Sequence, residues 1–389
     1  MEALIPPEWF AEKHPAILAV IAAVAMYALM KGADWLVDGA SDLAYGLGVP
    51  KVIVGATIVS LGTTAPECAV SVMAAWKGNA GLALGNAVGS IIADTGLIFG
   101  LGCALVVLPA DPQILSRQGW VQFGSAVLLA ALCYASFAID GEAAALGREV
   151  GGLFLVLLAL YMIISMKWSQ SAATAEAHAK ADEAAEGSSE EGGASEERAD
   201  VVKCLMMIVF GAAVVVFSSY MLIESVSEIA RQFGVPKVVI AGTVVAFGTS
   251  LPELMVAITS IRRGHFDLLV GNVVGADVLN VLFVIGASAV AAPLPIIDPE
   301  AKIPEVFLLL HLPAMLTILL MFRIFIFKAS KTGKFSRWMG YPLLATYLAF
   351  LIGSLATTSD PDEKGHGASS NGSLDTRQHY VRAADSFER

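Results

Sequence analysis

A long internal repeat constrains the fold of this 389-residue chain more than any other feature. Residues 48–100 align with residues 234–286 without a gap, at a constant offset of 186, and 19 of the 53 aligned positions are identical. Three motifs occur once in each half: Gly48-Val-Pro-Lys-Val and Gly234-Val-Pro-Lys-Val, Gly62-Thr-Thr-Ala-Pro-Glu67 and Gly248-Thr-Ser-Leu-Pro-Glu253, and Gly85-Asn-Ala-Val-Gly89 and Gly271-Asn-Val-Val-Gly275. Such self-similarity indicates a duplicated structural unit.

The repeat lies in a chain with the composition of a membrane protein. Hydrophobic residues make up 56% of the sequence and charged residues only 15%, and the charges crowd into residues 170–200 and 357–389. A helix needs about 20 mostly apolar residues to cross a bilayer. The sequence predicts ten such spans, near residues 15–33, 50–75, 80–107, 119–139, 149–167, 202–230, 237–261, 267–291, 304–327 and 338–356. We therefore predict an all-α integral membrane protein.

Ten spans and one duplication predict two halves of five helices each. An odd number of spans turns the second half upside down relative to the first, which is the inverted-repeat plan of many secondary transporters. We predict the first half at 1–167, an acidic solvated linker at 168–200, the second half at 201–356 and a disordered polar tail at 357–389. The linker and the tail are too poor in apolar residues to offset the entropy of ordering.

The distribution of basic residues indicates the orientation. With the N-terminus outside, the predicted cytoplasmic loops hold nine Lys and Arg residues and the outside loops hold six. Because basic loops stay in the cytoplasm, we expect both termini outside and residues 168–200 inside. We expect a multi-pass protein of the cell (inner) membrane.

Two acidic residues, Glu67 and Glu253, lie well inside apolar spans at equivalent positions of the repeat. A charge near the middle of a bilayer costs several kcal/mol, so such residues predict a functional site. The proline before each glutamate lacks an amide proton, leaves a carbonyl without its helical donor and predicts an interrupted helix, with the glutamate near the start of the following half-helix. Hydroxyl side chains precede each proline: Thr63, Thr64, Thr249 and Ser250. Carboxylate, hydroxyl and carbonyl oxygens together favour a hard cation such as Na⁺ or Ca²⁺. The alternative is a pair of neutral, hydrogen-bonded glutamic acids that holds the two halves together.

A second polar set follows on the third and eighth predicted spans. Asn86, Ser90 and Asp94 are spaced four residues apart, so they lie on one face of a helix. Their counterparts are Asn272, Ala276 and Asn280. We expect Asp94 to line the same site as the two glutamates.

These motifs resemble the alpha repeats of the cation/calcium exchanger superfamily, which includes the sodium/calcium exchangers. The resemblance covers all ten predicted spans. It implies the ten-helix fold of that family, alternating access by sliding of the first and sixth helices, and Ca²⁺ extrusion driven by Na⁺ entry. By motif match it implies Ca²⁺ ligation by Thr63, Glu67, Thr249 and Glu253, and Na⁺ ligation by Thr64, Ser90, Ser250 and the same glutamates, helped by backbone carbonyls near Ser60 and Ala246.

The chain departs from the family pattern at several of these positions. Thr64 stands where serine is usual and keeps the hydroxyl, whereas Ala276 replaces a serine and removes one expected Na⁺ ligand. Asp94 and Asn280 hold two positions that carry Asn or Asp in the family. Asp277 replaces an asparagine, so the site is expected to hold three carboxylates, or four if Asp277 turns inward; facing another helix, it would be protonated or hydrogen-bonded.

Further acidic residues recur at the repeat offset near the ends of the first and sixth spans. Asp38 and Glu224 form one such pair, and Asp42 and Glu228 form another. They either line an access path for cations or are solvated at the membrane surface.

The sequence leaves the coupling ion open. The same carboxylates accept protons, so proton-coupled antiport of calcium or another divalent cation is the alternative, and the hydroxyl missing at Ala276 leans toward it. Potassium cotransport is a further variant. A passive cation channel also uses acidic side chains, but paired interrupted helices in an inverted repeat disfavour it. No hydrolase or phosphate-loop motif occurs in the spans, so we expect no enzyme activity. We expect no cofactor beyond the transported Ca²⁺ and Na⁺, no nucleic-acid partner, and a functional monomer in the lipid bilayer.

Overall fold

The computed structural model describes residues 6–47, 49–110, 112–186, 201–233, 250–297 and 304–358. Within these ranges nine helices are long and apolar enough to cross a membrane. The predicted span 237–261 lies partly outside the described residues, and its described part is helix α12 (Leu251–Arg263). Apart from four two-residue strands, the described elements are helical, which confirms the prediction of an all-α membrane protein.

The elements of the first half, in which η denotes a π-helical or 3₁₀ turn, are α1 (Pro7–Ala11), α2 (Pro15–Leu47), α3 (Lys51–Val54), η1 (Gly55–Val59), α4 (Ser60–Trp76), α5 (Ala80–Ala93), η2 (Asp94–Phe99), α6 (Gly100–Leu105), β1 (Leu108–Pro109), α7 (Pro112–Asp140), η3 (Gly141–Ala143), β2 (Ala145–Leu146) and α8 (Arg148–Glu186). Those of the second half are α9 (Val201–Gln232), α12, α13 (Phe266–Leu279), η5 (Asn280–Ile285), α14 (Gly286–Ala291), β3 (Leu294–Pro295), η6 (Phe307–His311), α15 (Leu312–Thr332), β4 (Lys334–Phe335), η7 (Arg337–Met339) and α16 (Gly340–Thr358).

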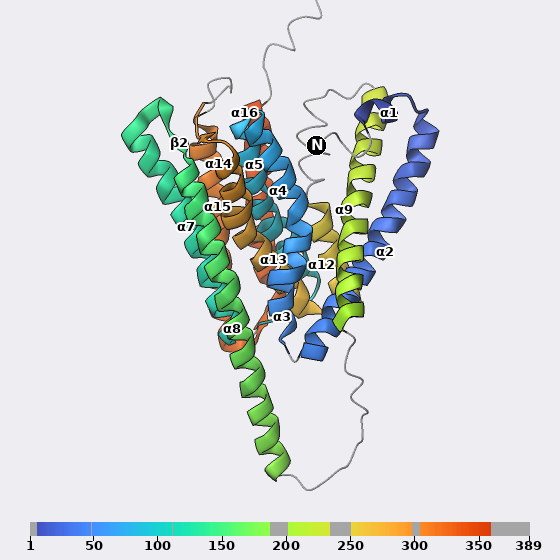
Figure 1. The fold of residues 1–389 in the computed structure, drawn as a ribbon, viewed down its shortest axis with the longest axis vertical. Coiled ribbons are helices and arrows are strands. Elements are labelled where there is room, and N and C mark those ends of the chain that lie inside the picture. Colours follow the sequence, from blue (N-terminus) through green and yellow to red (C-terminus); the bar gives the residue numbers. More distant parts are fainter. Residues whose placement is uncertain are drawn as a thin grey trace, which may run out of the picture. The chain divides into compact units, whose positions relative to one another are not determined.

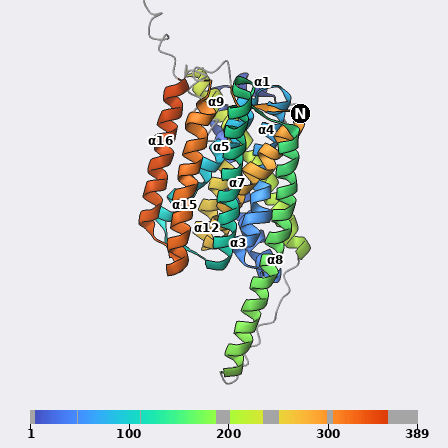
Figure 2. The same ribbon diagram turned by 90° about the vertical axis from the view of Figure 1, so that its left-hand side faces the viewer.

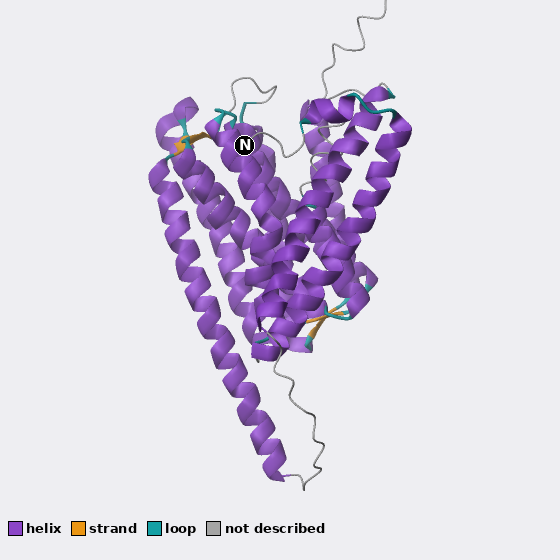
Figure 3. Ribbon diagram, turned by 45° about the vertical axis from the view of Figure 1, so that its right-hand side comes forward, coloured by secondary structure: helices purple, strands orange, loops and turns teal. Residues whose placement is uncertain are grey.

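The duplication is visible in the boundaries of these elements. α5, η2, α6 and β1 each begin and end 186 residues before α13, η5, α14 and β3. The short strands pair across the halves. Strand β1 of the first half pairs with β4 of the second, and β3, the repeat counterpart of β1, pairs with β2 of the first half. The two ribbons lie at opposite ends of the helical bundle (Figure 3). Two halves related by an inversion produce this exchange of partners.

Helices α2 and α9, which occupy equivalent places in the two halves, lie side by side and run in opposite directions (Figure 1). Ile208, near the start of α9, packs in one apolar cluster with Leu36, whereas Val215, farther along α9, packs with Leu29. We use the name linker end for the end of the bundle where α2 ends and α9 begins. The opposite end, where α2 begins and α9 ends, is the amino end.

A central group of helices lies between the α2–α9 pair and an outer group made of α7, α8, α15 and α16, which face the viewer in Figure 2. The most apolar window of the 266–291 span, which contains α13, is 94% buried, whereas that of the 337–357 span is only 17% buried. The outer helices expose large apolar side chains such as Leu320, Leu348 and Ile352. Exposed apolar surface of this kind is expected where lipid is the solvent.

The helix around Pro66 is not interrupted at the proline, which corrects the sequence-based expectation. α4 runs continuously through Pro66, and the irregular backbone lies earlier, in the π-helical turn η1. There the Ser60 hydroxyl donates a hydrogen bond to the carbonyl of Gly55 at 2.6 Å. Pro66 removes only the hydrogen bond to the carbonyl four residues earlier, which is that of Gly62 inside α4, and the helix continues through it.

The equivalent proline of the second half does mark the start of a helix. α12 begins at Leu251 with Pro252 in its first turn, where a missing amide proton leaves no hydrogen bond unmade. Glu253 therefore lies in the first turn of α12, where the helix dipole favours a negative charge. Glu67, by contrast, lies in the middle of α4. The two repeat-related acids thus occupy different local environments.

Helix α8 continues well past the membrane span that it contains. The apolar span ends at Trp168, but the helix runs to Glu186, where we predicted a solvated linker. Alanine and glutamate dominate residues 172–186, and both are strong helix formers. Residues 187–200 lie outside the described residues, as does the predicted tail beyond Thr358.

Candidate ion-binding site

The two repeat-related glutamates meet inside the bundle, one from each half. Glu67 on α4 and Glu253 on α12 are each 1% exposed, and their carboxyl groups lie close enough for ionised forms to repel each other. Both carboxyl oxygens of Glu67, and Oε2 of Glu253, lack a hydrogen-bond partner among the described residues. A pair of glutamic acids that only holds the halves together would use these oxygens in hydrogen bonds. The geometry favours a site that presents them to a ligand.

Two asparagines at equivalent repeat positions fix the helices around these acids. Asn86 Nδ2 donates to Ser71 Oγ at 2.9 Å and to the backbone carbonyl of Glu67 at 3.3 Å, which ties α5 to α4. Its counterpart Asn272 lies with Oδ1 3.4 Å from Thr63 Oγ1, which ties α13 of the second half to α4 of the first. The same Thr63 side chain lies within hydrogen-bonding reach of the Glu253 carboxyl. These contacts position the backbone beside the site.

Asp94 and Asn280, another repeat-related pair, complete the buried group. Each is 1% exposed, and none of their side-chain nitrogen and oxygen atoms has a partner among the described residues. Asp94 lies close enough to Glu67 and Glu253 for electrostatic repulsion. Both residues begin a π-helical turn, η2 and η5 respectively. Such turns are frequent at functional sites because they shift a side chain out of the helical register.

The hydroxyl candidates fall into three groups. Thr64 Oγ1 and Ser250 Oγ are buried and have no partner among the described residues. Ser90 is buried on α5. Thr249 and the carbonyl of Ala246 lie outside the described residues. The unpartnered oxygens of the described candidates therefore come from both halves.

The spacing of the carboxyl groups limits what they can do alone. In the described part of the chain, no three Asp, Glu, His or Cys side chains converge closely enough to hold a metal ion by themselves. Ca²⁺ takes roughly six to eight oxygen ligands. Carboxylates spaced in this way therefore bind a cation only together with hydroxyl and carbonyl oxygens. Thr64, Ser250 and Asn280 carry oxygens of that kind that have no partner among the described residues.

Asp277 is held by side chains outside this group. Its Oδ2 accepts hydrogen bonds from Thr95 Oγ1 and Gln122 Nε2, each at 2.5 Å, while Oδ1 has no partner among the described residues. Asp277 therefore faces α7 and η2, and only its Oδ1 lacks a partner among the described residues, although Asp94 is near enough to repel it.

Gln122 is a residue that the sequence analysis missed. It lies on α7, outside the duplicated blocks, together with two other buried polar residues, Gln118 and Ser125. Their spacing of four and three residues places them on one face of an otherwise apolar helix. These polar residues on an apolar helix were the available sequence signal for Gln122, but the pattern does not predict which residue Gln122 contacts.

The fold and the buried acids define the class of protein. Two inverted repeats that meet at carboxylates inside a membrane-spanning bundle are the plan of secondary transporters. A model of the sodium/calcium exchanger protein family matches residues 17–167 and 203–356. The chain belongs to this family of membrane transporters.

Individual relatives agree with the family match. The chain is 30% identical over 340 residues to the putative antiporter CaxA of Alkalimonas amylolytica, covering 86% of this chain and 97% of that protein. It is 30% identical over 341 residues to the sodium/calcium exchanger MaX1 of Methanosarcina acetivorans, covering 83% and 94%. A solved structure of the sodium-calcium exchanger NCX_Mj, soaked with Na⁺ and Sr²⁺, matches with a TM-score of 0.68 at 24% identity, covering 88% and 99%. The structural match shows the shared fold.

Proposed function

We propose that this protein exchanges Ca²⁺ for Na⁺ across the cell (inner) membrane by alternating access to one shared site. The observation that carries the proposal is the convergence of Glu67 and Glu253 from the two inverted halves. Both are buried, and each has a carboxyl oxygen without a partner among the described residues. Membership of the sodium/calcium exchanger family supports it, as does the relative that bears the name of a sodium/calcium exchanger.

The exchange follows from the electrostatics of the site. Ionised carboxylates that lie close together in a medium of low dielectric repel each other strongly. The site without cations is therefore costly, and either Ca²⁺ or several Na⁺ ions relieve the repulsion. Because both ions use the same oxygens, their binding is mutually exclusive. Movement of the loaded site from one face to the other then exchanges one ion for the other.

The proposed ligands follow the motifs and the unpartnered atoms. Ca²⁺ is bound by Glu67 and Glu253 with the hydroxyls of Thr63 and Thr249. Na⁺ uses the same glutamates with the remaining hydroxyl and carboxamide or carboxylate groups, which are Thr64, Ser90, Asp94, Ser250 and Asn280. Asp277 adds at most its free oxygen. The cycle needs no cofactor, and one chain supplies both halves of the site, so we propose a functional monomer. We further propose that the linker end of the bundle faces the cytoplasm and that both termini lie outside.

Proton coupling is the second candidate, and two observations favour it. Asp277 adds a fourth buried acid beside Glu67, Glu253 and Asp94, and Ala276 supplies no hydroxyl where the family resemblance implies a serine. A site with more acids and fewer neutral oxygens is better suited to protons.

The experiment that separates these candidates is Ca²⁺ uptake into proteoliposomes that contain the purified protein. One set of vesicles carries an outward Na⁺ gradient at constant pH, and the other carries an outward proton gradient without Na⁺. We expect uptake with the Na⁺ gradient only. Uptake with the proton gradient only selects the alternative, and downhill Ca²⁺ flux without a counter-ion shows a channel.

Two variants link the transport to the site. Glu67→Gln is expected to abolish uptake, because it removes one of the shared charges. Glu149→Gln, at an exposed position at the start of α8, is the matched control and is expected to transport normally. Normal transport by Glu67→Gln contradicts the assignment of that residue.

A further inference from the structure

Helix α12 connects the ion site directly to a pair of acids on α2. Arg263 is the last residue of α12 and lies ten residues after Glu253, or about 15 Å along the helix. Its Nη2 lies 3.0 Å from Asp38 Oδ2 and 3.6 Å from Asp34 Oδ1. Gly264, in the left-handed conformation at φ 73°, ends the helix beyond Arg263. This ion pair joins α12 to α2 at the linker end of the bundle.

The inverted repeat places counterparts of this arrangement at the amino end. Lys77 is the counterpart of Arg263, lies ten residues after Glu67 at the end of α4, and is followed by Gly78 at φ 80°. Glu224 on α9 is the counterpart of Asp38. In the described structure, however, Lys77 is exposed and forms no ion pair, and Glu224 has no hydrogen-bond partner among the described residues.

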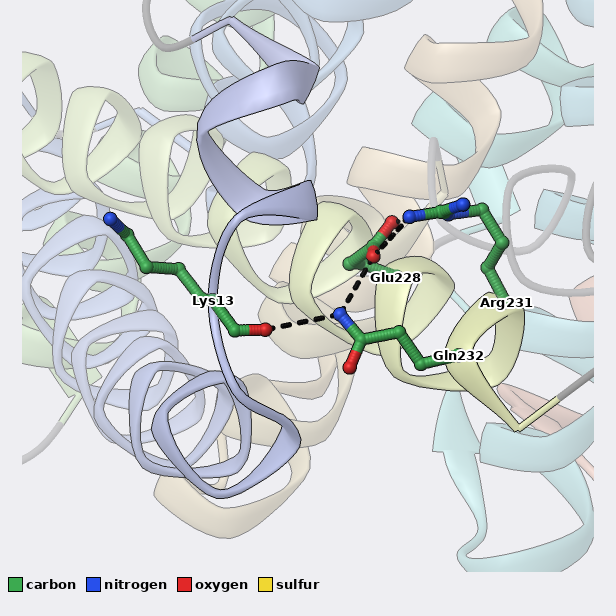
Figure 4. Close-up of polar contacts among 4 residues, drawn as sticks. All are labelled: Lys13, Glu228, Arg231 and Gln232. Atoms are coloured by element: carbon green, nitrogen blue, oxygen red, sulfur yellow. Dashed lines mark hydrogen bonds and ion pairs between the residues drawn. The ribbon is translucent and has the colours of Figure 1, made fainter.

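A second acid on α9, Glu228, is the repeat counterpart of Asp42 rather than of Asp34, and it is already satisfied within its own helix. Glu228 accepts hydrogen bonds from Arg231 at 2.6 and 2.7 Å and from Gln232 at 2.8 Å (Figure 4). Gln232 also donates to the backbone carbonyl of Lys13 at 3.0 Å, just before α2 begins. The same contacts that occupy Glu228 therefore tie α9 to the start of α2. Of these two acids on α9, Glu224 is the one left to accept a new partner.

We infer that the Arg263–Asp38 pair and the Lys77–Glu224 pair are two alternating latches, closed one at a time, that hold the α2–α9 unit at opposite ends of the bundle. The reasoning is that of the inverted repeat: an asymmetry between equivalent contacts is exchanged between the halves when the site opens to the other side. The described state has the linker-end latch closed. The inference rests on alternating access in the proposed function, and it assigns Arg263, Asp34, Asp38, Lys77 and Glu224 as positioning residues.

The latches predict opposite effects for equivalent substitutions. Arg263→Ala destabilises the state that is closed at the linker end, so the state open to that end becomes more populated. The apparent Ca²⁺ affinity then rises when it is measured from the linker side and falls when it is measured from the amino side. Lys77→Ala does the reverse. We expect shifts of about two- to fivefold, since the Arg263 side chain is 45% exposed and partly exposed ion pairs are weak. The measurement is Ca²⁺ uptake against Ca²⁺ concentration in vesicles of known orientation.

Two control variants separate the latch from general damage. Arg262→Ala removes the same charge from the neighbouring exposed position and is expected to shift neither affinity. Arg263→Lys keeps a positive charge at this position, where the other half also carries a lysine (Lys77), and is expected to behave like the unaltered protein. Shifts in the same direction for Arg263→Ala and Lys77→Ala, or an equal shift for Arg262→Ala, overturn the inference.

Disulfide trapping tests the pair that the described state does not show. In the full-length protein, Lys77→Cys with Glu224→Cys is expected to form a disulfide in membranes during turnover, to stop exchange, and to recover on reduction. Asp38→Cys with Arg263→Cys is expected to do the same and to trap the opposite state. Failure of the Lys77–Glu224 pair to form a disulfide while the Asp38–Arg263 pair does so overturns the inference. Disulfide formation is scored on the protein itself and does not depend on a transport assay. If both pairs form disulfides but the protein transports no Ca²⁺, the result supports the latches and refutes the proposed function.

Discussion

A single added methyl group at Gly275 tests the close packing that holds the two halves at the site. A Cβ at this position would lie 2.2 Å from Ser60 Oγ, 2.4 Å from the carbonyl oxygen of Ala56 and 2.5 Å from its Cα. Ordinary contacts of this kind are 3.4 Å or longer, so α13 and the α3–α4 segment must separate by about 1 Å. Overpacking costs about 1–3 kcal/mol, and the better helix propensity of alanine offsets about 0.5–1 kcal/mol. We expect Gly275→Ala to be less stable by roughly 1–2 kcal/mol.

The assay is thermal unfolding of the purified protein in detergent, with exchange in proteoliposomes as a second readout. Gly124→Ala is the matched control, because Gly124 lies in the interior of α7 and no described atom outside its own stretch of helix lies within 4 Å of the added Cβ. The control is expected to unfold at the same temperature as the unaltered protein or slightly above it. An unfolding temperature for Gly275→Ala at or above that of Gly124→Ala would refute the packing argument.

Three further predictions concern single side chains. Gln122→Leu leaves Asp277 Oδ2 with one donor fewer and is expected to destabilise the protein by about 1–3 kcal/mol in the same unfolding assay; an unchanged unfolding temperature contradicts the hydrogen bond. Burial, together with Lys51 Nζ at 3.0 Å, lowers the pKa of His265 below its ordinary value. The unfolded chain therefore binds a proton at His265 more readily than the folded chain does, so the folded state is most stable above about pH 6.5 and loses stability as the pH falls below that value. His265→Gln is expected to flatten the fall in unfolding temperature between neutral and acidic pH. An unaltered pH dependence in this variant would count against the prediction. Glu67→Gln is expected to remain folded in the unfolding assay, and its collapse would make its loss of transport uninformative about the site.

The parts of the fold that the sequence predicts are those encoded locally or by repetition. Apolar spans are local, and the constant offset of 186 residues relates Glu67 to Glu253 without any knowledge of contacts. The boundaries of α5 and α13 repeat at the same offset, so the duplication extends from residue identity to helix geometry.

The features that the sequence did not predict depend on how the chain distributes strain or on distant partners. Pro66 shows that a helical donor is missing but does not show where the backbone relaxes, and the structure places the irregular turn in η1. The direction of Asp277 depends on Gln122, which lies 155 residues away on a helix outside the repeat. The helix that continues to Glu186 follows from local propensity, which an argument from burial alone overlooked.

The central claim is that Glu67 and Glu253 belong to one cation site rather than to two. Its most direct test is equilibrium Ca²⁺ binding to the purified protein by titration calorimetry, with and without Na⁺, for the unaltered chain and for Glu67→Gln and Glu253→Gln. We expect Ca²⁺ binding that Na⁺ competes away and that either substitution alone abolishes. Retention of Na⁺-sensitive Ca²⁺ binding by either variant would contradict the claim.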